Sequence, residues 1–189
     1  MKDPKAGTVA IVLAAGSASR FGGDKLSAML RGEPLLFHAI RAARAAPVSQ
    51  VVVVARPGLD CGEWPGEPPV EVIRLNSSAL SDSLKAGIAA ASGARCVLVF
   101  LGDMPAVPHA MAALLLAQIG SAYAALPRHH GKPGHPALLS AAAFPDMDGL
   151  TGDEGAGRIL RQRADVVFVD CDDPAIHFDV DRPEDLRRA

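Results

Sequence analysis

A glycine-rich turn with two cationic side chains follows the first apolar run of the chain, residues 8–13. The residues that could bind a ligand here are Leu13, Ala14, Ala15, Gly16, Ser17, Arg20 and Lys25. Backbone N–H groups of such a turn can approach phosphate oxygens closely, because glycine has no Cβ in the way. A guanidinium fork and an ammonium group attract the same anion. The turn indicates a nucleoside triphosphate site, although its glycine spacing is neither that of a P-loop nor that of a dinucleotide-binding fold. The alternative is a tight connection between two elements with solvated charges.

Acidic side chains follow a later apolar run and recur near the end of the chain. Asp103 comes directly after Gly102, which follows the run at residues 95–101. Asp179 and Asp181 alternate along an extended segment, so their side chains share one face. Mg²⁺ takes oxygen ligands and commonly bridges one or two carboxylates to substrate phosphates. These acids are candidates for a magnesium site, and the alternative for each is a helix cap or a turn.

The bulk composition favours a small-molecule substrate. The chain has 189 residues, which is most simply one domain spanning residues 1–189. The formal net charge of -2 gives no electrostatic case for a nucleic acid or a membrane as partner. Since only 4% of the residues are aromatic, Ala, Val and Leu are expected to fill the interior.

The cysteines and the apolar runs favour a cytoplasmic location. Cys61, Cys96 and Cys171 lie far apart and form no C-x-x-C pair, so neither a disulfide framework nor a zinc knuckle is indicated. No apolar run approaches membrane-spanning length, and no export signal is recognised. The adjacent His129 and His130 have no acidic or thiol partner at ligand spacing, which argues against zinc.

Short apolar runs alternate with amphipathic stretches, a pattern typical of a parallel sheet with crossover helices. The expected strands are residues 8–13, 50–55, 70–74, 95–101, 121–126 and 165–170. Five helices are expected. The first has Pro34 as its first residue (N1), the next three cover residues 81–91, 108–118 and 155–162, and the last begins at Pro183. The sequence thus predicts a single doubly wound, Rossmann-like α/β domain with a mostly parallel sheet. Because ligands bind outside the carboxyl ends of the strands in such sheets, the turn and the acids are expected at one edge.

Five motifs occur in order along the chain and together resemble one enzyme family. They are the turn from Leu13 to Lys25, Gly102-Asp103-Met104-Pro105, Gly134-His135-Pro136, Gly152-Asp153-Glu154-Gly155-Ala156 and Asp179-Val180-Asp181-Arg182-Pro183-Glu184-Asp185. The set resembles the molybdenum cofactor nucleotidyltransferases, which are MobA-like NTP transferases, and most closely their cytidylyltransferase branch. The likeness runs from Val9 to about Leu186. It implies a Rossmann-like fold of the nucleotide-diphospho-sugar transferase type.

The resemblance implies a Mg²⁺-dependent nucleotidyl transfer. The terminal phosphate of molybdopterin or molybdenum cofactor would attack the α-phosphorus of CTP, which gives the cytosine dinucleotide cofactor and releases pyrophosphate. Within the family an Ala-Ala-Gly turn goes with cytidine and Ala-Gly-Gly with guanosine, so Ala14-Ala15-Gly16 favours CTP. A molybdenum hydroxylase or its maturation chaperone is implied as a further partner. The alternatives are guanylyl transfer to the same acceptor, nucleotidyl transfer to a sugar phosphate, and a non-enzymatic carrier of the mature cofactor.

The resemblance also implies roles for individual residues. Arg20, Lys25 and Asp103 would be catalytic, the two cations by balancing charge on the leaving pyrophosphate. Asp103 and Asp181 would hold Mg²⁺, ahead of Asp179. The nucleotide-binding residues would be Leu13, Ala14, Ala15, Gly16, Ser17, Arg20, Lys25, Asn76, Ser81, Ser83 and Gly102. The acceptor-binding residues would be Gly134, His135, Pro136 and Asp153, and a helix cap is the alternative for Ser81 and Asp153.

Overall fold

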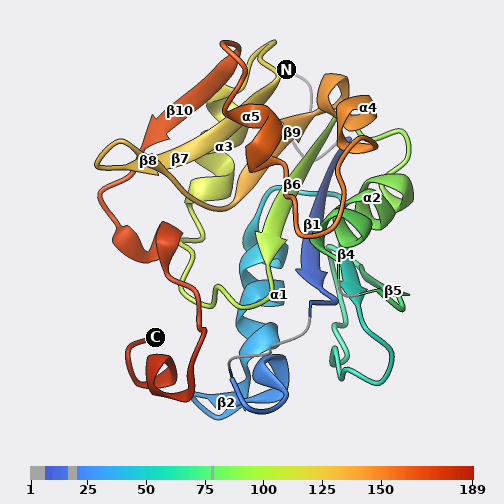
Figure 1. The fold of residues 1–189 in the computed structure, drawn as a ribbon, viewed down its shortest axis with the longest axis vertical. Helices are drawn as coiled ribbons and strands as arrows, with labels where there is room; N and C mark the ends of the chain where they lie inside the picture. The colour runs from blue at the N-terminus through green and yellow to red at the C-terminus, as the bar shows by residue number, and fades with distance from the viewer. Residues whose placement is uncertain (1–6, 17–20, 78) are drawn as a thin grey trace.

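An eight-stranded mixed sheet forms the centre of the computed structural model, which describes residues 7–16, 21–77 and 79–189 (Figure 1). The strands of this sheet are β1 (Thr8–Ala14), β4 (Gln50–Ala55), β5 (Val70–Arg74), β6 (Cys96–Leu101), β7 (Ala124–His129), β8 (Lys132–Pro133), β9 (Ala137–Ser140) and β10 (Val166–Asp170). They follow the order β10-β7-β9-β6-β1-β4-β5, and β8 pairs with β7. All of them run parallel except β9, which lies antiparallel between β6 and β7, and β8. The expected α/β class with a mostly parallel sheet is confirmed.

The strands predicted from long β-branched runs are the ones that were placed well. β4 and β5 have the predicted bounds, and β1, β6 and β10 differ by one residue at one end. The prediction for β7 was wrong, because residues 121–123 form a turn and the strand continues through Pro127 to His129. β9 was missed, since a four-residue run directly after a proline carries little periodicity.

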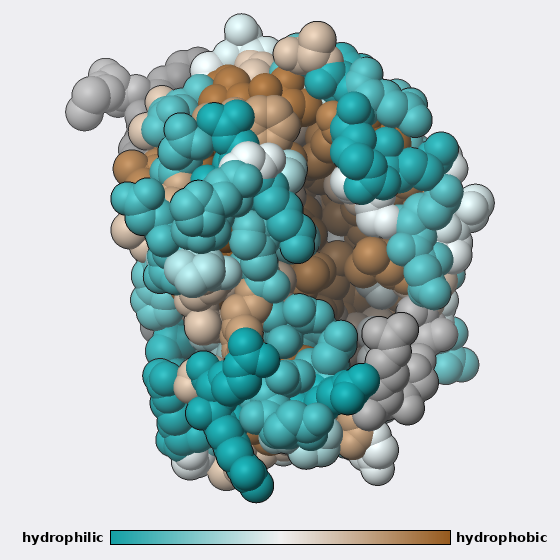
Figure 2. Space-filling view, turned by 60° about the vertical axis from the view of Figure 1, so that its left-hand side comes forward, coloured by the Kyte–Doolittle hydropathy of each residue, from teal (hydrophilic) through white to brown (hydrophobic). Residues whose placement is uncertain are grey.

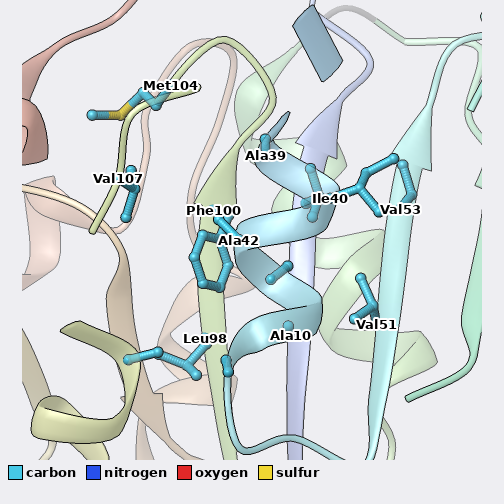
Figure 3. Close-up of a cluster of buried hydrophobic side chains, with 14 of the residues drawn as sticks. Ala10, Ala39, Ile40, Ala42, Val51, Val53, Leu98, Phe100, Met104 and Val107 are labelled. Atoms are coloured by element: carbon cyan, nitrogen blue, oxygen red, sulfur yellow. The ribbon is translucent and has the colours of Figure 1, made fainter. Parts of the chain in front are cut away.

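Helices cover both faces of the sheet. One face carries α1 (Leu35–Ala45) and α3 (Met111–Gln118), and the other carries α2 (Leu80–Ala90), α4 (Phe144–Met147) and α5 (Gly157–Leu160). Alternate residues of each central strand point to opposite layers, so Val12 packs on the α1 side and Ile11 on the α2 side. Figure 3 shows Ile40 of α1 beside Val53 of β4 in this layer of the core. Alanines on α1 let the helix approach the sheet closely, as the small share of aromatic residues predicted.

All five helix predictions need correction at their ends, since α2 is shifted by one residue from the predicted 81–91 and α5 is shorter than the predicted 155–162. Pro34 is the N-cap of α1 rather than its first residue, and α3 begins at Met111 instead of residue 108. The segment after Pro183 is a 3₁₀ helix, η4 (Pro183–Arg187). The other short elements are η1 (Lys25–Ser27), η2 (Ala141–Ala143), η3 (Pro174–His177) and a two-stranded sheet of β2 (Met29–Leu30) and β3 (Glu33–Pro34). Within the described ranges, no helix is both long and apolar enough to cross a bilayer.

Candidate active site

The turn after β1 lies beside the end of β6. The backbone N–H of Gly102 donates to the carbonyl of Leu13 at 2.9 Å, which ties the two strand ends together. A Cβ at Gly102 would lie 3.0 Å from that carbonyl oxygen, so glycine permits this close approach. Ala14 and Ala15 are buried, whereas Gly16 is exposed and faces open space. Ser17 and Arg20, both predicted ligands of the triphosphate, lie outside the described residues.

Lys25 is brought to the same edge by η1, the short helix that follows the turn. Asp24 is the N-cap of η1, and its carboxylate accepts from the Ser27 hydroxyl at 2.6 Å. Arg56, which directly follows β4, pairs with Asp24 at 2.5 Å and so joins η1 to the sheet. The ammonium group of Lys25 then lies 2.8 Å from an oxygen of Asp103.

Three carboxylates meet around this ammonium group. One oxygen from each of Asp103, Asp179 and Asp181 lies within 4.8 Å of the others, and Lys25 also reaches Asp181 at 3.5 Å. The backbone N–H of Val180 donates to the carbonyl of Asp103 at 3.0 Å, so the segment after η3 is held against the end of β6. The predicted convergence of residues 103 and 181 is therefore seen, and Asp179, ranked behind them, lies in the same cluster.

The electrostatics of the cluster suit a hard cation. Burial raises the pKa of Asp179, the nearby charges of Asp181 and Asp103 raise it further, and Lys25 opposes them. A cluster of carboxylates with one ammonium group is short of positive charge. The all-oxygen donor set is the kind that Mg²⁺ and Mn²⁺ take in phosphate-binding sites.

The cap alternative for these acids is wrong, whereas the turn alternative holds for Asp103, which lies in the turn after β6. The N-cap of η4 is Arg182, and the N-cap of α3, the helix after Asp103, is Ala110. Asp185 accepts hydrogen bonds from the backbone N–H groups of Asp181 and Arg182 at 3.1 and 2.9 Å. The carboxylate of Asp181 is thus left to face Lys25 rather than to cap a helix.

A cavity of about 290 Å³ opens at the same edge of the sheet. It extends from the ends of β1 and β6 and the start of α2 across to β7, β9 and β10, and the loop before α5 closes one side. Figure 2 shows a hollow with hydrophobic walls on this part of the surface. Most of its lining is aliphatic, as at Leu13, Leu84, Leu101 and Leu160. Ligand cavities commonly have apolar walls and a few polar groups.

Asn76, Ser81 and Ser83, predicted to bind the nucleotide, lie in and before α2, the helix whose Leu80 and Leu84 line the cavity, but none of the three lines it directly. Ser81 is fully buried, and its hydroxyl has no hydrogen-bond partner in the described part of the chain. The cap alternative for Ser81 is wrong, because Ala79 is the N-cap of α2. The Ser83 hydroxyl already donates to the carbonyl of Ala79 at 3.2 Å, and Asn76 is exposed on the preceding loop.

Gly134 and His135, predicted to bind the acceptor, line the cavity from the other side. A Cβ at Gly134 would lie only 2.5 Å from the carbonyl oxygen of Ile176, so only glycine fits where the residue after β8 approaches η3. Burial lowers the pKa of His135, and its Nδ1 is buried without a partner among the described residues. Pro136 is buried next to it.

Asp153 is the predicted acceptor residue that the structure does not bring to the cavity. It is exposed, whereas Gly155, Ala156 and Gly157 of the same loop contribute to the lining. The cap alternative for Asp153 is also wrong, since Ala156 is the N-cap of α5.

Most of the lining was not predicted, including its cation Arg161 and its aromatic residue Phe168. Arg161 follows α5, and Phe168 lies in β10. The one signal that could have suggested Phe168 is an aromatic residue in the last predicted strand. Arg161 belongs to a run of charged residues and carries no such signal.

The comparisons with known proteins agree with this geometry. The family model described as the MobA-like NTP transferase domain matches residues 10–167. The purine catabolism protein PucB of Bacillus subtilis is 29% identical, with 96% of each chain covered. A probable molybdenum cofactor guanylyltransferase of Thermococcus sibiricus is 33% identical over 52% of this chain and 49% of its own.

A solved structure supports the same assignment. The Rv0371c homologue from Mycobacterium sp. strain JC1 superposes with a TM-score of 0.82 at 29% identity, covering 96% of this chain and 93% of its own. With a glycine turn, a paired lysine and three acids at one sheet edge, the chain belongs to the MobA-like NTP transferase domain family of nucleotidyltransferases.

Proposed function

We propose that the protein transfers CMP from CTP to the terminal phosphate of molybdopterin or molybdenum cofactor. An oxygen of the acceptor phosphate forms a bond to the α-phosphorus of CTP, the bond from that phosphorus to the bridging oxygen breaks, and pyrophosphate leaves. The observation that carries the proposal is the meeting of Lys25 with Asp103, Asp179 and Asp181 beside the β1 turn. Phosphoryl-type transfer asks a protein mainly for positioning and charge stabilisation, which these groups supply.

Mg²⁺ is the metal we propose for this site. Asp103 and Asp181, with Asp179 beside them, would hold it through carboxylate oxygens. When bound, the ion neutralises charge on the phosphates of the nucleotide. Lys25 would then be displaced from Asp103 toward the leaving pyrophosphate, and Arg20 would support the same charge.

Contacts to the nucleoside are proposed for the start of α2 and the β1 turn. The buried hydroxyl of Ser81 has no hydrogen-bond partner among the described residues and does not cap its helix, which supports a role for it in binding the nucleoside. The choice of cytosine rests on Ala14-Ala15-Gly16 and on the family resemblance. Guanylyl transfer is the second candidate, since the relative from T. sibiricus is named a guanylyltransferase.

Gly134, His135 and Pro136 are proposed to contact the acceptor. Asp153, exposed beside that side of the cavity, stays a proposed contact on the resemblance alone. We place the reaction in the cytoplasm, within one domain of 189 residues, and propose hand-over of the product to a molybdenum hydroxylase or its maturation chaperone.

A nucleotide-selectivity assay tests the proposal. The purified protein is incubated with molybdopterin, Mg²⁺ and each of CTP, GTP, ATP and UTP, and pyrophosphate release and the dinucleotide product are quantified. We expect CTP to give the highest kcat/KM. Preference for GTP would overturn the choice of base, turnover only with a sugar phosphate would overturn the acceptor, and binding without any turnover would favour a carrier.

A matched pair of variants tests the site itself. Asp103→Asn should lower kcat by at least ~100-fold, the scale of losing one preorganised electrostatic group. Asp148→Asn removes an exposed carboxylate next to α4 and should leave kcat unchanged. Equal rates for the two variants would contradict the role of Asp103.

A further inference from the structure

The far end of the cavity carries an aromatic ring and a cation that the proposed reaction has not used. Phe168 lines the cavity and is 40% exposed, one of three large hydrophobic side chains with that degree of exposure in the described ranges. An exposed aromatic side chain at the mouth of an apolar cavity offers a stacking surface to a ligand.

The ring of Phe168 is held in place from outside. The guanidinium carbon of Arg128 lies 5.4 Å from the ring centroid, and Arg128 is itself fixed by Asp170, with Nε 2.9 Å from the carboxylate. In the parallel pair of β7 and β10, Asp170 and Arg128 are register partners. The Phe168 wall is therefore preorganised, which lowers the entropic cost of stacking a ligand on it.

Arg161 supplies a cation beside this wall. Its Nη1 lies 3.4 Å from the position that a Cβ would take at Gly157, so the guanidinium folds back over a cavity-lining glycine. The nearby Arg158 pairs with Glu154 at 3.2 Å. For Arg161, by contrast, no carboxylate partner is found in the part of the chain that the structure describes. A guanidinium fork without a carboxylate is free to hydrogen-bond the edge of a ligand.

Position along the sheet decides which substrate reaches this end. β10 is four strands away from β1, which at about 4.8 Å per strand is roughly 19 Å. The start of α2, proposed to contact the nucleoside, lines the cavity at the β1 end through Leu80 and Leu84, which leaves the β10 end to the acceptor.

We infer that this end of the cavity binds the pterin ring of the acceptor, with Phe168 stacking on the ring and Arg161 donating hydrogen bonds to its edge. The inference rests on the proposed function and names the contacts that select its acceptor. The two residues are specificity determinants and take no part in the transfer itself.

A binding assay with 6-hydroxymethylpterin tests the inference without turnover. Binding is measured by the quenching of the pterin's fluorescence when it stacks on an aromatic ring. Replacing the ring in Phe168→Leu should weaken binding about 10- to 100-fold, the range for losing one stacked aromatic contact. Phe168→Trp should restore binding, because the aromatic face returns. Arg161→Ala should weaken binding by about tenfold, and Leu114→Ala, an exposed apolar residue on α3, should have no effect.

Steady-state kinetics separates the inference from the proposed function. The Phe168→Leu and Arg161→Ala variants should show a raised KM for molybdopterin with an unchanged KM for CTP. If the wild-type protein turns over molybdopterin and the variants match it in KM and in pterin binding, the inference is overturned and the proposed function stands. If the wild-type protein uses a different acceptor and binds no pterin, both fall.

Discussion

Replacing Lys25 by methionine should have opposite effects on the binding of a divalent metal ion and on catalysis. The Lys25 side chain is only 13% exposed, and its ammonium group lies 2.8 and 3.5 Å from oxygens of Asp103 and Asp181. For unit charges 2.8 Å apart, the attraction is about 1.5 kcal/mol in water and about 6 kcal/mol at an effective dielectric constant of 20. Desolvation offsets much of it, and both carboxylates can rehydrate in the variant.

We therefore expect Lys25→Met to lower the free energy of unfolding by about 1–2 kcal/mol in the absence of divalent cations. The pKa of Asp179 should rise further, since the charge of Lys25 opposes its increase, together with a backbone hydrogen bond. Divalent cations should bind severalfold more tightly, because a competing positive charge is gone. An ion at 100 times its Kd adds about 2.7 kcal/mol of stability, so saturating Mn²⁺ should remove the deficit. Turnover should still fall by at least ~100-fold.

Three measurements on the purified variant check this reasoning. Denaturant unfolding with and without Mn²⁺ gives the stabilities, electron paramagnetic resonance of free Mn²⁺ gives the affinity, and pyrophosphate release gives kcat. Lys132→Met, which changes an exposed lysine of β8, is the matched control and should equal the wild type in all three. Weaker Mn²⁺ binding in Lys25→Met, or turnover within threefold of wild type, would refute the account of Lys25.

Three further outcomes follow from other parts of the structure. Gly134→Ala should lower the free energy of unfolding by about 1–3 kcal/mol, because the new Cβ would be overpacked against the Ile176 carbonyl. Gly149→Ala is the control: its Cβ would have only an ordinary 3.6 Å contact, so it should lose far less stability in the same denaturant titration. Burial and a hydrogen bond to Asp146 raise the pKa of Tyr123 to about 12, so its contribution to stability is complete below about pH 10 and is lost as the pH rises through 12. Thermal melts should therefore show Tyr123→Phe about 1 kcal/mol less stable at pH 7, with a shallower loss above pH 10, and parallel pH profiles would refute this. Removing divalent cations with EDTA should abolish pyrophosphate release and added Mg²⁺ should restore it, so full activity in EDTA would rule out a metal-dependent reaction.

The sequence was informative where local patterns match the final environment. β4 was placed correctly because the run Val51–Val54 stays apolar on both faces of a buried sheet. The strand-like segments suggested that Asp103 and one of Asp179 and Asp181 share an ion, and the choice of Asp181 came from the family resemblance. The error at Ser81 shows the limit of cap statistics: α2 starts one residue earlier than expected, and Ala79 caps it without a side chain.

What the sequence could not supply was the approach of distant loops. Phe168 and Arg161 line one cavity only because the loop before α5 closes over β10. No periodicity or spacing encodes that closure. The same holds for Gly134, whose requirement for glycine comes from Ile176, 42 positions away in the chain.

A crystal structure with Mn²⁺ and a non-hydrolysable CTP analogue would test the central claim most directly, because the anomalous signal of the ion marks its position. We predict the ion on oxygens of Asp103 and Asp181, the triphosphate against the backbone of Ala15 and Gly16, and the Lys25 ammonium moved from Asp103 onto the β- or γ-phosphate. Density for the triphosphate away from the β1 turn, or an ion bound without contact to Asp103, would contradict it.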